Sequence, residues 1–251
     1  MRIISWNVNG FRSVMNKGAL EVLNQYDADI ICFQETRCPE DAFLNPTYDV
    51  IKDAYPYRYI VESEKKGYAG VGIYSKYVSQ PVKTTLVPGR AICREFRKFY
   101  LLNLYVPNSK PDLSALPARI ESWERSIREF INELQETKPV IVVGDFNVAP
   151  TDLDIYMKKP QKTHGATLEE REAFSQLLIE CNLIDTYRHI KGNMKGEWTW
   201  YSNFGNARAN GNGWRIDLAL VSKNSAKKIR DHQILSDVKG SDHIPIMLTT
   251  T

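Results

Sequence analysis

Residues 139–147, Pro-Val-Ile-Val-Val-Gly-Asp-Phe-Asn, constrain the fold of this chain more than any other stretch. Four β-branched apolar residues between Pro139 and Gly144 predict a short buried strand. Asp145 and Asn147 follow two positions apart, so both would point to the same side if the strand geometry continued. Such a pair is placed to act on a polar substrate. Asp and Asn also favour turns, and the stretch taken alone fits both interpretations equally.

The length and composition fit a single globular domain spanning residues 1–251. A chain of 251 residues can bury a large core and still form one α/β domain. A hydrophobic content of 43% and a charged content of 25% are ordinary for such proteins. The net charge is only +3, so any surface that binds nucleic acid must be a local patch.

The cysteines and the first residues predict a cytoplasmic protein, associated with the nucleoid if the source is a prokaryote. The four cysteines form neither a Cys-x-x-Cys motif nor a zinc spacing, which is typical of reduced thiols. No signal-like apolar segment precedes the first motif, which begins within a few residues of Met1 and leaves no room for a targeting extension. No apolar run approaches the length of a membrane span, so no membrane partner is expected.

Apolar periodicity predicts an α/β fold in which two packed mixed β-sheets are flanked by helices. Strand-like runs occur at 3–6, 29–33, 71–74, 99–106, 140–143, 215–221 and 244–248. Apolar residues spaced three and four apart predict amphipathic helices over 116–136, 169–181 and 19–26.

Residues 203–213 interrupt this pattern. The segment Asn-Phe-Gly-Asn-Ala-Arg-Ala-Asn-Gly-Asn-Gly contains too much Gly and Asn for regular structure. It predicts either a mobile surface loop or a segment that shapes itself to a ligand, because loops on rigid scaffolds often carry function.

Six apolar runs end in side chains that bind metals or phosphates, or that move protons. The segments are 3–10, 29–36, 103–108, 139–147, 213–217 and 241–245. One such ending could arise by chance, but six form a pattern. The chemistry that requires this set is metal-assisted hydrolysis of a phosphodiester.

The acid at the end of the second run, Glu35, predicts a metal site. Together with oxygen ligands such as Asn7 or Asp242 it suits a hard cation, Mg²⁺ or Mn²⁺, that keeps several waters. The ion would neutralise a phosphate oxygen and stabilise the leaving alkoxide. A lone Glu is more often an acid at the start of a helix, so this prediction depends on the other strand ends.

The remaining polar residues predict the catalytic roles. Asp145 is suited to deprotonate the attacking water, and Asn147 and Tyr105 can donate hydrogen bonds to phosphoryl oxygens. A nearby carboxylate favours imidazolium, so His243 held by Asp217 would stay protonated and contact the phosphate.

Each of these residues also has a structural interpretation. Tyr105 fits a core aromatic with a hydrated hydroxyl, and His243 beside Asp242 fits a surface pair that contributes little. Trp200 and Trp214 are more often core residues than platforms for a ligand. Each of these structural interpretations is sufficient for a single residue. They do not explain why so many polar side chains stand at the ends of apolar runs.

The chain resembles the exonuclease III family of apurinic/apyrimidinic (AP) endonucleases, within the larger endonuclease–exonuclease–phosphatase superfamily. The resemblance runs from Arg2 to Leu248 and rests on motifs in the family's order: Trp-Asn-Val-Asn-Gly, Gln-Glu-Thr, Gly-Tyr-Ala-Gly-Val-Gly, Tyr-Val-Pro-Asn, Gly-Asp-Phe-Asn-Val-Ala, Gly-Trp-Arg-Ile-Asp and Ser-Asp-His. It implies a four-layer α/β sandwich with the active site at one edge of the paired sheets. It also implies a monomer that uses Mg²⁺ (Mn²⁺ as a substitute) to cleave duplex DNA 5′ to an abasic site, leaving a 3′-hydroxyl, with 3′-phosphodiesterase and 3′→5′ exonuclease side activity.

The resemblance also assigns site residues, motif by motif. Near the metal ion it places Glu35, Asn7, Asn9 and Asp242. In the catalytic set it places Tyr105, Asp145, Asn147, Asp217 and His243. For DNA contacts it points to Arg12, Tyr68, Trp200, Trp214 and the 203–213 loop. The aromatic residues of this last set would line a pocket for the base-free sugar, with basic residues on the flanking phosphates.

Several residues depart from the pattern of the family. Asn9 stands where some members have Asp, which removes one possible carboxylate from the metal site. Arg37 follows Gln-Glu-Thr where Lys is familiar, and Lys110 stands in a segment that lacks the expected Arg. His164 has no obvious counterpart, which leaves the ratio of exonuclease to endonuclease activity open. Trp214, in contrast, makes the chain look more like the abasic endonuclease subgroup.

Three alternatives remain open at this point. The same site would serve a predominantly 3′→5′ exonuclease or a 3′-phosphatase. A superfamily relative could instead hydrolyse inositol or lipid phosphates, although Trp200, Trp214 and the Asn/Gly-rich loop argue against that substrate. A non-enzymatic DNA-binding module would require a broken active site, whereas every catalytic position is filled.

Overall fold

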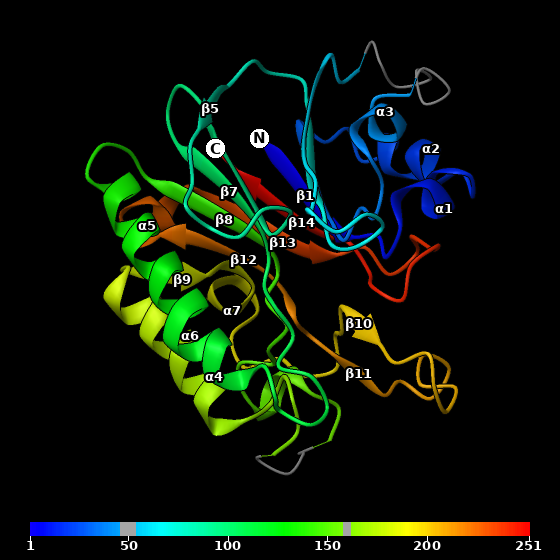
Figure 1. The fold of residues 1–251 in the computed structure, drawn as a ribbon, viewed down its shortest axis with the longest axis vertical. Coiled ribbons are helices and arrows are strands. Elements are labelled where there is room, and N and C mark those ends of the chain that lie inside the picture. Colours follow the sequence, from blue (N-terminus) through cyan, green and yellow to red (C-terminus); the bar gives the residue numbers. More distant parts are fainter. Residues whose placement is uncertain (46–53, 158–161) are drawn as a thin grey trace.

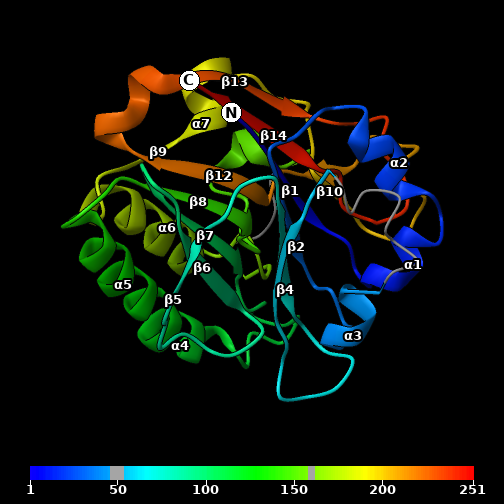
Figure 2. The same ribbon diagram turned by 90° about the horizontal axis from the view of Figure 1, so that it is seen from above.

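The central strands of this chain are apolar on both faces, so each sheet needs a packed layer on either side. The computed structural model describes residues 1–45, 54–157 and 162–251. Within them two six-stranded sheets pack face to face, with α1, α2 and α3 outside one sheet and α4, α5 and α6 outside the other (Figures 1 and 2). The predicted fold class, two packed mixed sheets flanked by helices in four layers, is confirmed.

The first sheet contains the N-terminal and C-terminal strands. Its order is β13 (Ile229–Ile234), β14 (Ile246–Thr250), β1 (Arg2–Asn7), β2 (Ile30–Gln34), β4 (Val71–Ser75) and β3 (Tyr57–Val61). Only the pair β1–β2 is parallel. Helices α1 (Phe11–Met15), α2 (Ala19–Asn24) and α3 (Glu40–Phe43) cover its outer face.

The second sheet contains the strand predicted from residues 139–147. Its order is β5 (Gln80–Val82), β6 (Ala91–Glu95), β7 (Tyr100–Tyr105), β8 (Val140–Asp145), β12 (Asp217–Ser222) and β9 (Leu183–Asp185). Only β7–β8 is parallel. The helical elements of this half are α4 (Leu116–Ala118), η2 (Arg119–Glu124), α5 (Arg125–Gln135), η3 (Asp152–Asp154), α6 (Leu168–Glu180), α7 (Thr186–Lys191) and η4 (Lys223–Lys228). A two-stranded hairpin, β10 (Trp200–Tyr201) and β11 (Gly213–Trp214), projects beyond the sheets (Figure 1).

Neighbouring residues of one strand belong to different parts of the core. On β8, Ile141 and Val143 pack between the two sheets, whereas Val140 and Val142 pack against the helices. This alternation follows from the two-residue period of a strand. It explains why the run of four apolar residues was a strong signal for a strand that is buried on both faces.

Gly144 allows β7 and β8 to approach each other just before the site. Its φ of +148° is rarely adopted by residues with a side chain. A Cβ atom at this position would overlap the carbonyl oxygen of Leu104 on β7. A glycine is therefore required one residue before Asp145.

The structure corrects several predicted elements. The helix predicted over 116–136 is interrupted by η2, a π-helical turn, because periodicity cannot detect one extra residue within a turn. The other two predicted helices are present with ends shifted by one or two residues. The strands β3, β5, β6, β9, β10, β11 and β13 were missed. They are short or rich in polar residues, and their pairing with neighbouring strands holds them in the sheets. No helix within the described residues is long and apolar enough to cross a membrane.

Candidate active site

The polar strand endings predicted from the sequence meet at one end of the sandwich. Asn7 ends β1, Tyr105 ends β7 and Asp145 ends β8, while Asp217 begins β12 directly opposite Asp145 in the register. Glu35 follows the last residue of β2. Parallel neighbours end at the same edge of a sheet and an antiparallel neighbour begins there, so the topology gathers the polar residues of each sheet at one edge. The packing of the two sheets then brings the two groups together.

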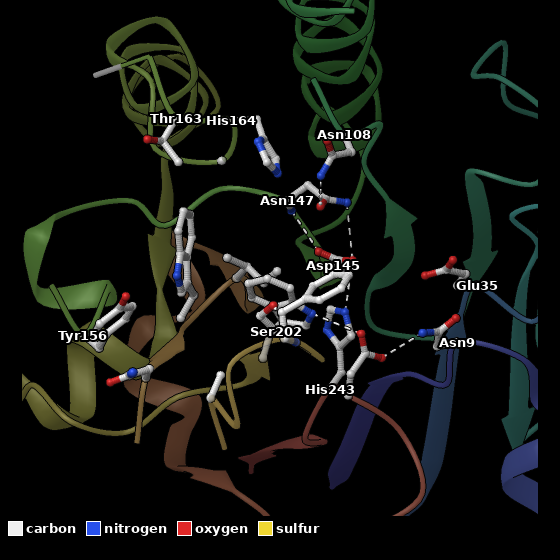
Figure 3. Close-up of a pocket in the computed structure, with 18 of the residues that line it drawn as sticks. Asn9, Glu35, Asn108, Asp145, Asn147, Tyr156, Thr163, His164, Ser202 and His243 are labelled. Carbon is white, nitrogen blue, oxygen red and sulfur yellow. Dashed lines mark hydrogen bonds and ion pairs between the residues drawn. The ribbon is translucent and has the colours of Figure 1, made fainter. Parts of the chain in front are cut away.

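A pocket of about 840 Å³ opens at this end. Its lining includes these residues of the predicted site: Asn9, Glu35, Tyr105, Asp145, Asn147, Trp200, Trp214, Asp242 and His243. Figure 3 shows Glu35 and Asn9 on one side of Asp145 and His243, with Tyr156 and Thr163 on the opposite side. The pocket is therefore formed by both sheets and by the β10–β11 hairpin.

Asp145 and Asn147 reach the pocket by a turn and not by continued strand geometry. The strand ends at Asp145, and Asn147 has a left-handed backbone with φ of +49°. The backbone N–H of Asn147 donates to Oδ1 of Asp145 at 2.9 Å, which is an Asx turn. The two interpretations of this stretch, a turn and a site, are thus compatible, and the assumption of strand geometry beyond Asp145 was wrong.

His243 lies between two acids at the floor of the pocket. Its Nδ1 lies 2.8 Å from Oδ2 of Asp217, and its Nε2 lies 3.9 Å from Oδ2 of Asp145. Burial opposes the charged imidazole, but Asp217 outweighs this effect and raises the pKa of His243 to about 10. Burial also raises the pKa of Asp145 to about 7, against the opposing charge of His243. The geometry therefore favours an imidazolium beside an acid that can exchange a proton near neutral pH.

Tyr105 is held as a neutral phenol. Burial and the negative charges of Glu35 and Asp145 raise the pKa of Tyr105 well above its ordinary value. The guanidinium of Arg90 lies over the Tyr105 ring at 4.4 Å and over the Tyr68 ring at 5.2 Å. A tyrosine in this state donates a hydrogen bond and does not attack as a phenolate.

The four residues predicted near a metal ion form one hydrogen-bonded chain. Asn7 donates through Nδ2 to Oε2 of Glu35 at 3.1 Å and to Oδ2 of Asp145 at 2.9 Å. The backbone N–H of Asn9 donates to Oδ1 of Asn7, and Nδ2 of Asn9 donates to Oδ1 of Asp242, both at 2.9 Å. Asn7 is fully buried behind the pocket with its amide nitrogen toward the acids, and the other three line the pocket.

The donor set at the pocket fits a hard divalent cation. The carboxylates of Glu35 and Asp242 and the amide oxygen of Asn9 are oxygen ligands of the kind that Mg²⁺ and Mn²⁺ prefer. Asp145, Asp217 and His243 also bring three potential ligand atoms within 4.8 Å of one another. A protonated His243 cannot ligate a cation, so we interpret this second group as an ion-paired triad.

The residues predicted to contact DNA occupy two regions. Trp200 and Trp214 are paired across the β10–β11 hairpin and both line the pocket. Their rings pack edge to face, with centroids 6.0 Å apart and planes at 88°. Arg12 lies exposed on α1 and does not line it. Tyr68 is 49% exposed, also lies outside the pocket, and is linked to it through Arg90.

The 203–213 loop forms part of the pocket wall and leads into β11. Phe204, Gly205, Ala207 and Asn212 line the pocket, and the Phe204 side chain is 85% exposed. An aromatic ring this exposed beside a pocket is suited to pack on a ligand. The interpretation of the segment as a loop that shapes a binding site therefore agrees with where the structure places it.

Sequence reasoning missed several residues of this pocket. They are Asn108, Tyr156, Thr163, Ser202 and Ile216. Asn108 was noted as the amide that ends the 103–108 run and the Tyr-Val-Pro-Asn motif but was given no role in the site, and its Nδ2 donates to Oδ1 of Asn147 at 3.0 Å. Ile216 lies within the predicted run 215–221, but an apolar residue there gave no reason to assign it to the site. Tyr156, Thr163 and Ser202 come from connecting segments that only the tertiary fold brings to the pocket. His164, noted as a departure, also lines it (Figure 3).

Known proteins are similar to this chain in fold and in sequence. A four-layer sandwich with an acid-rich pocket at one end is suited to a hydrolytic enzyme. The chain belongs to the endonuclease/exonuclease/phosphatase family, whose model matches residues 4–243. The resemblance predicted from the motifs is thereby confirmed.

Two curated relatives show how far the similarity extends. An exodeoxyribonuclease of Bacillus subtilis is 38% identical over 260 residues, covering 99% of this chain and 98% of the relative. Recombination repair protein 1 of Drosophila melanogaster is 37% identical, and the match covers 99% of this chain but only 37% of that longer protein.

Solved structures agree with the architecture over the whole chain. An AP endonuclease from Leishmania major superposes with a TM-score of 0.88 at 27% identity, covering 100% of this chain and 87% of that one. A 3′ phosphatase from Neisseria, solved with a product DNA hairpin, superposes with a TM-score of 0.85 at 25% identity, covering 100% and 99%. The relatives thus carry names for both internal cleavage and 3′-end processing.

Proposed function

We propose that this chain is a DNA-repair nuclease, a Mg²⁺-dependent class II AP endonuclease that cleaves duplex DNA 5′ to an abasic site and leaves a 3′-hydroxyl. The observation that carries the proposal is the meeting of Asp145, Asn147 and Tyr105 with the Asp217–His243 pair in one pocket. The relatives named as AP endonuclease and exodeoxyribonuclease support the substrate class. Processing of 3′ ends would be a side activity of the same site.

In this proposal the residues of the pocket have separate roles in hydrolysis. Asp145, with its pKa raised to about 7, takes a proton from the attacking water near neutral pH. The water oxygen forms a bond to phosphorus while the bond from phosphorus to the 3′ oxygen breaks. Protonated His243 and the phenol of Tyr105 donate hydrogen bonds to phosphoryl oxygens, where charge builds up in the transition state.

A divalent cation completes this proposal. Glu35, Asp242 and Asn9 would hold it at the pocket, with Asn7 behind them orienting Glu35 through its hydrogen bond. The bound ion would supply a Lewis acid for the phosphate and for the leaving oxygen.

Recognition of an abasic site follows from the walls of the pocket. Trp200 and Trp214 present apolar faces to a base-free sugar, and Phe204 is exposed at the adjoining loop. Exposed aromatic rings suit stacking against neighbouring bases. We further propose that the chain acts as a monomer in a reducing, cytoplasm-like compartment, which the four buried free cysteines support.

An assay on a defined substrate tests the proposal. Duplex DNA with one tetrahydrofuran abasic analogue is incubated with the protein in Mg²⁺, with and without EDTA. We expect one nick immediately 5′ to the analogue that requires the metal ion and is abolished in Asp145→Asn. The absence of a metal-dependent nick at the analogue would overturn the proposal. Turnover of inositol phosphate would revive the inositol or lipid phosphatase alternative, and duplex binding without any nicking would revive the binding module. Unchanged nicking by Asp145→Ala would contradict the role proposed for Asp145.

A predominantly exonucleolytic or 3′-phosphatase activity is the second candidate. The observation that favours it is His164, which lines the pocket (Figure 3) together with Trp214, where its side chain would take up room that a sugar needs. Degradation of blunt duplex ends or removal of a 3′-phosphate much faster than nicking at the analogue would select this candidate.

A further inference from the structure

Arg119 is an arginine buried in the helix layer, and its charge is directed at the turn that carries Asp145 and Asn147. Its side chain is only 1% exposed. Nη1 donates to the carbonyl oxygen of Asn147 at 2.9 Å, and Nη2 donates to that of Phe146 at 2.8 Å. Burying a guanidinium is unfavourable unless its donors find well-placed partners. Two of these partners are backbone atoms of the Gly-Asp-Phe-Asn motif.

The turn needs such partners because of its backbone conformation. Asn147 is left-handed and uses its own N–H for Asp145. Its side chain bridges Val106 and Asn108, accepting from Asn108 and donating to the Val106 carbonyl. Without Arg119, the carbonyl of buried Phe146 and the carbonyl of partly buried Asn147 would lose these donors. Arg119 therefore fixes the orientation of the peptide planes 146–147 and 147–148.

A second buried contact links Arg119 to the neighbouring loop. Nη1 also donates to Oε1 of Glu170 at 2.9 Å, and the same oxygen accepts from Oγ of Ser109 at 2.6 Å. Glu170 is fully buried and belongs to the capping box of α6 with Thr167. Ser109 follows Asn108, which contacts the Asn147 side chain. The Arg119–Glu170 pair thus joins the 105–109 loop and the 145–147 turn beneath the pocket.

The π-helical turn explains how the helix layer can present this arginine. Hydrogen bonds in a π turn run from residue i to i+5, so residues five apart lie on the same side. Arg119 and Glu124 are spaced in this way, and Nε of Arg119 lies 3.4 Å from Oε1 of Glu124. In an uninterrupted α-helix this pair would not share a face. Single π turns occur frequently at functional sites, although they are rare elsewhere.

We propose that Arg119 is a positioning residue that holds the Asp145–Asn147 turn in its working geometry from the helix layer. The proposal rests on the proposed hydrolysis at this pocket. Displacement of a catalytic group by about 1 Å can cost about 100-fold in rate. A variant without the guanidinium fork should therefore lose turnover while it still binds DNA.

The first test compares Arg119→Met and Arg119→Lys with Arg125→Met, a control on the adjoining helix whose exposed side chain pairs with Glu129. On the abasic-analogue duplex we expect kcat to fall about 30-fold or more in both Arg119 variants, with KM within about threefold, and no change in the control. Lysine should fail because it keeps the charge without the planar fork. A kcat within threefold of wild type in Arg119→Lys would overturn the proposal. If Arg119→Met fails to fold, the kcat of Arg119→Lys alone tests the proposal.

A double-mutant cycle separates positioning from general destabilisation. Because Arg119 acts on the turn, its loss should cost several-fold less in an Asn147→Ala background than in the wild type. Equal losses in both backgrounds would show that Arg119 acts elsewhere.

A third readout does not require activity. Hydrogen exchange of the Asn147 backbone amide should accelerate about tenfold or more in Arg119→Lys, and not in Arg125→Met, because this amide donates within the turn. Unchanged protection would overturn the positioning role. If the wild-type protein fails to nick DNA but exchange at Asn147 still accelerates in Arg119→Lys, the result would count against the proposed function and support the role of Arg119 in the turn.

Discussion

At the scale of single residues, the pKa values in this site are set by burial and by neighbouring charges, and for His243 the strongest of these charges is Asp217. His243 is adjacent to Asp242 in the sequence, but its imidazole is bound by Asp217, which lies on another strand. The sequence neighbours Asp242 and His243 therefore do not form the ion pair that sets the charge of His243. The side chain of Asp242 instead accepts from Asn9 at 2.9 Å and from Trp200 at 3.2 Å.

The pH dependence of cleavage follows from these two groups. Asp145 must lose its proton to act as a base, so kcat/KM should rise as the pH passes about 7. His243 must keep its proton, so the rate should fall as the pH passes about 10. Asp217→Asn removes the charge that raises the pKa of His243, and the alkaline limb should move to lower pH. Asp112→Asn, at an exposed loop position, should leave the profile unchanged. An identical alkaline limb in Asp217→Asn would contradict this assignment.

His164 should control the choice between internal cleavage and end processing. Replacing it with Ala enlarges the pocket beside Trp214. We expect the ratio of abasic nicking to 3′-phosphate removal to rise at least about tenfold, which is the scale that a few pocket atoms contribute to specificity. His189→Ala, at an exposed position on α7, is the matched control. Rates for both substrates are measured side by side, and an unchanged ratio would rule out His164 as a determinant.

At the scale of elements, buried amides fix how the two sheets meet beneath the pocket. Nε2 of Gln34, at the end of β2, donates to Oδ1 of Asn103 on β7 at 2.7 Å. Nδ2 of Asn103 donates back to the carbonyls of Phe33 and Gly72, both at 3.0 Å. Glu35 and Tyr105 lie one and two residues beyond this contact. The distance between the metal-binding side and the catalytic side of the pocket thus depends on this amide pair.

Breaking the amide pair should destabilise the fold. Gln34→Leu leaves the amide oxygen of fully buried Asn103 without a partner, which costs about 1–3 kcal/mol. Urea unfolding measures this loss. Gln80→Leu, on the exposed edge strand β5, should change the free energy of unfolding by less than about 0.5 kcal/mol. A stability for Gln34→Leu equal to that of the control would show that the two sheets do not depend on this contact.

At the scale of the whole molecule, the pocket is anchored to the edge strand β9 and to α7 by buried charge. Arg215 lies between the pocket residues Trp214 and Ile216, but its own side chain points into the protein and is 1% exposed. Nε donates to Asp154 at 2.6 Å and Nη2 donates to Asp185 at 2.7 Å. Asp185 also caps the start of α7. Arg188 on α7 also pairs with Asp154, so two arginines join the wall of the pocket to this helix.

Removing Arg215 should be among the most damaging changes in the chain. Arg215→Met would leave Asp185 buried without its cation and Asp154 with Arg188 as its remaining cation, and breaking a buried pair in this way costs about 3–5 kcal/mol. Thermal and urea unfolding should both show the loss. Arg230→Met, at an exposed position on edge strand β13, serves as the control. A loss below about 1 kcal/mol would mean that the acids find other partners.

The sequence by itself determined the fold class, most central strands and the residue types at their ends. These features follow from local rules, because a run such as Val140–Val143 is apolar on both faces wherever it is placed, and parallel strands end at one edge. The ordered motifs supplied the family. The predicted roles of Asp145, Asn147 and the metal-binding residues remain predictions that the assays above address.

Only the tertiary structure decided how those residues work together. The left-handed turn at Asn147, the choice of Asp217 as the partner of His243 and the pKa of Asp145 all depend on burial and on contacts between distant segments. The same holds for Arg119, which the periodicity placed within an ordinary helix. Apolar spacing records which face of an element is buried. It carries no information about which buried polar groups meet, because that depends on how separate elements pack.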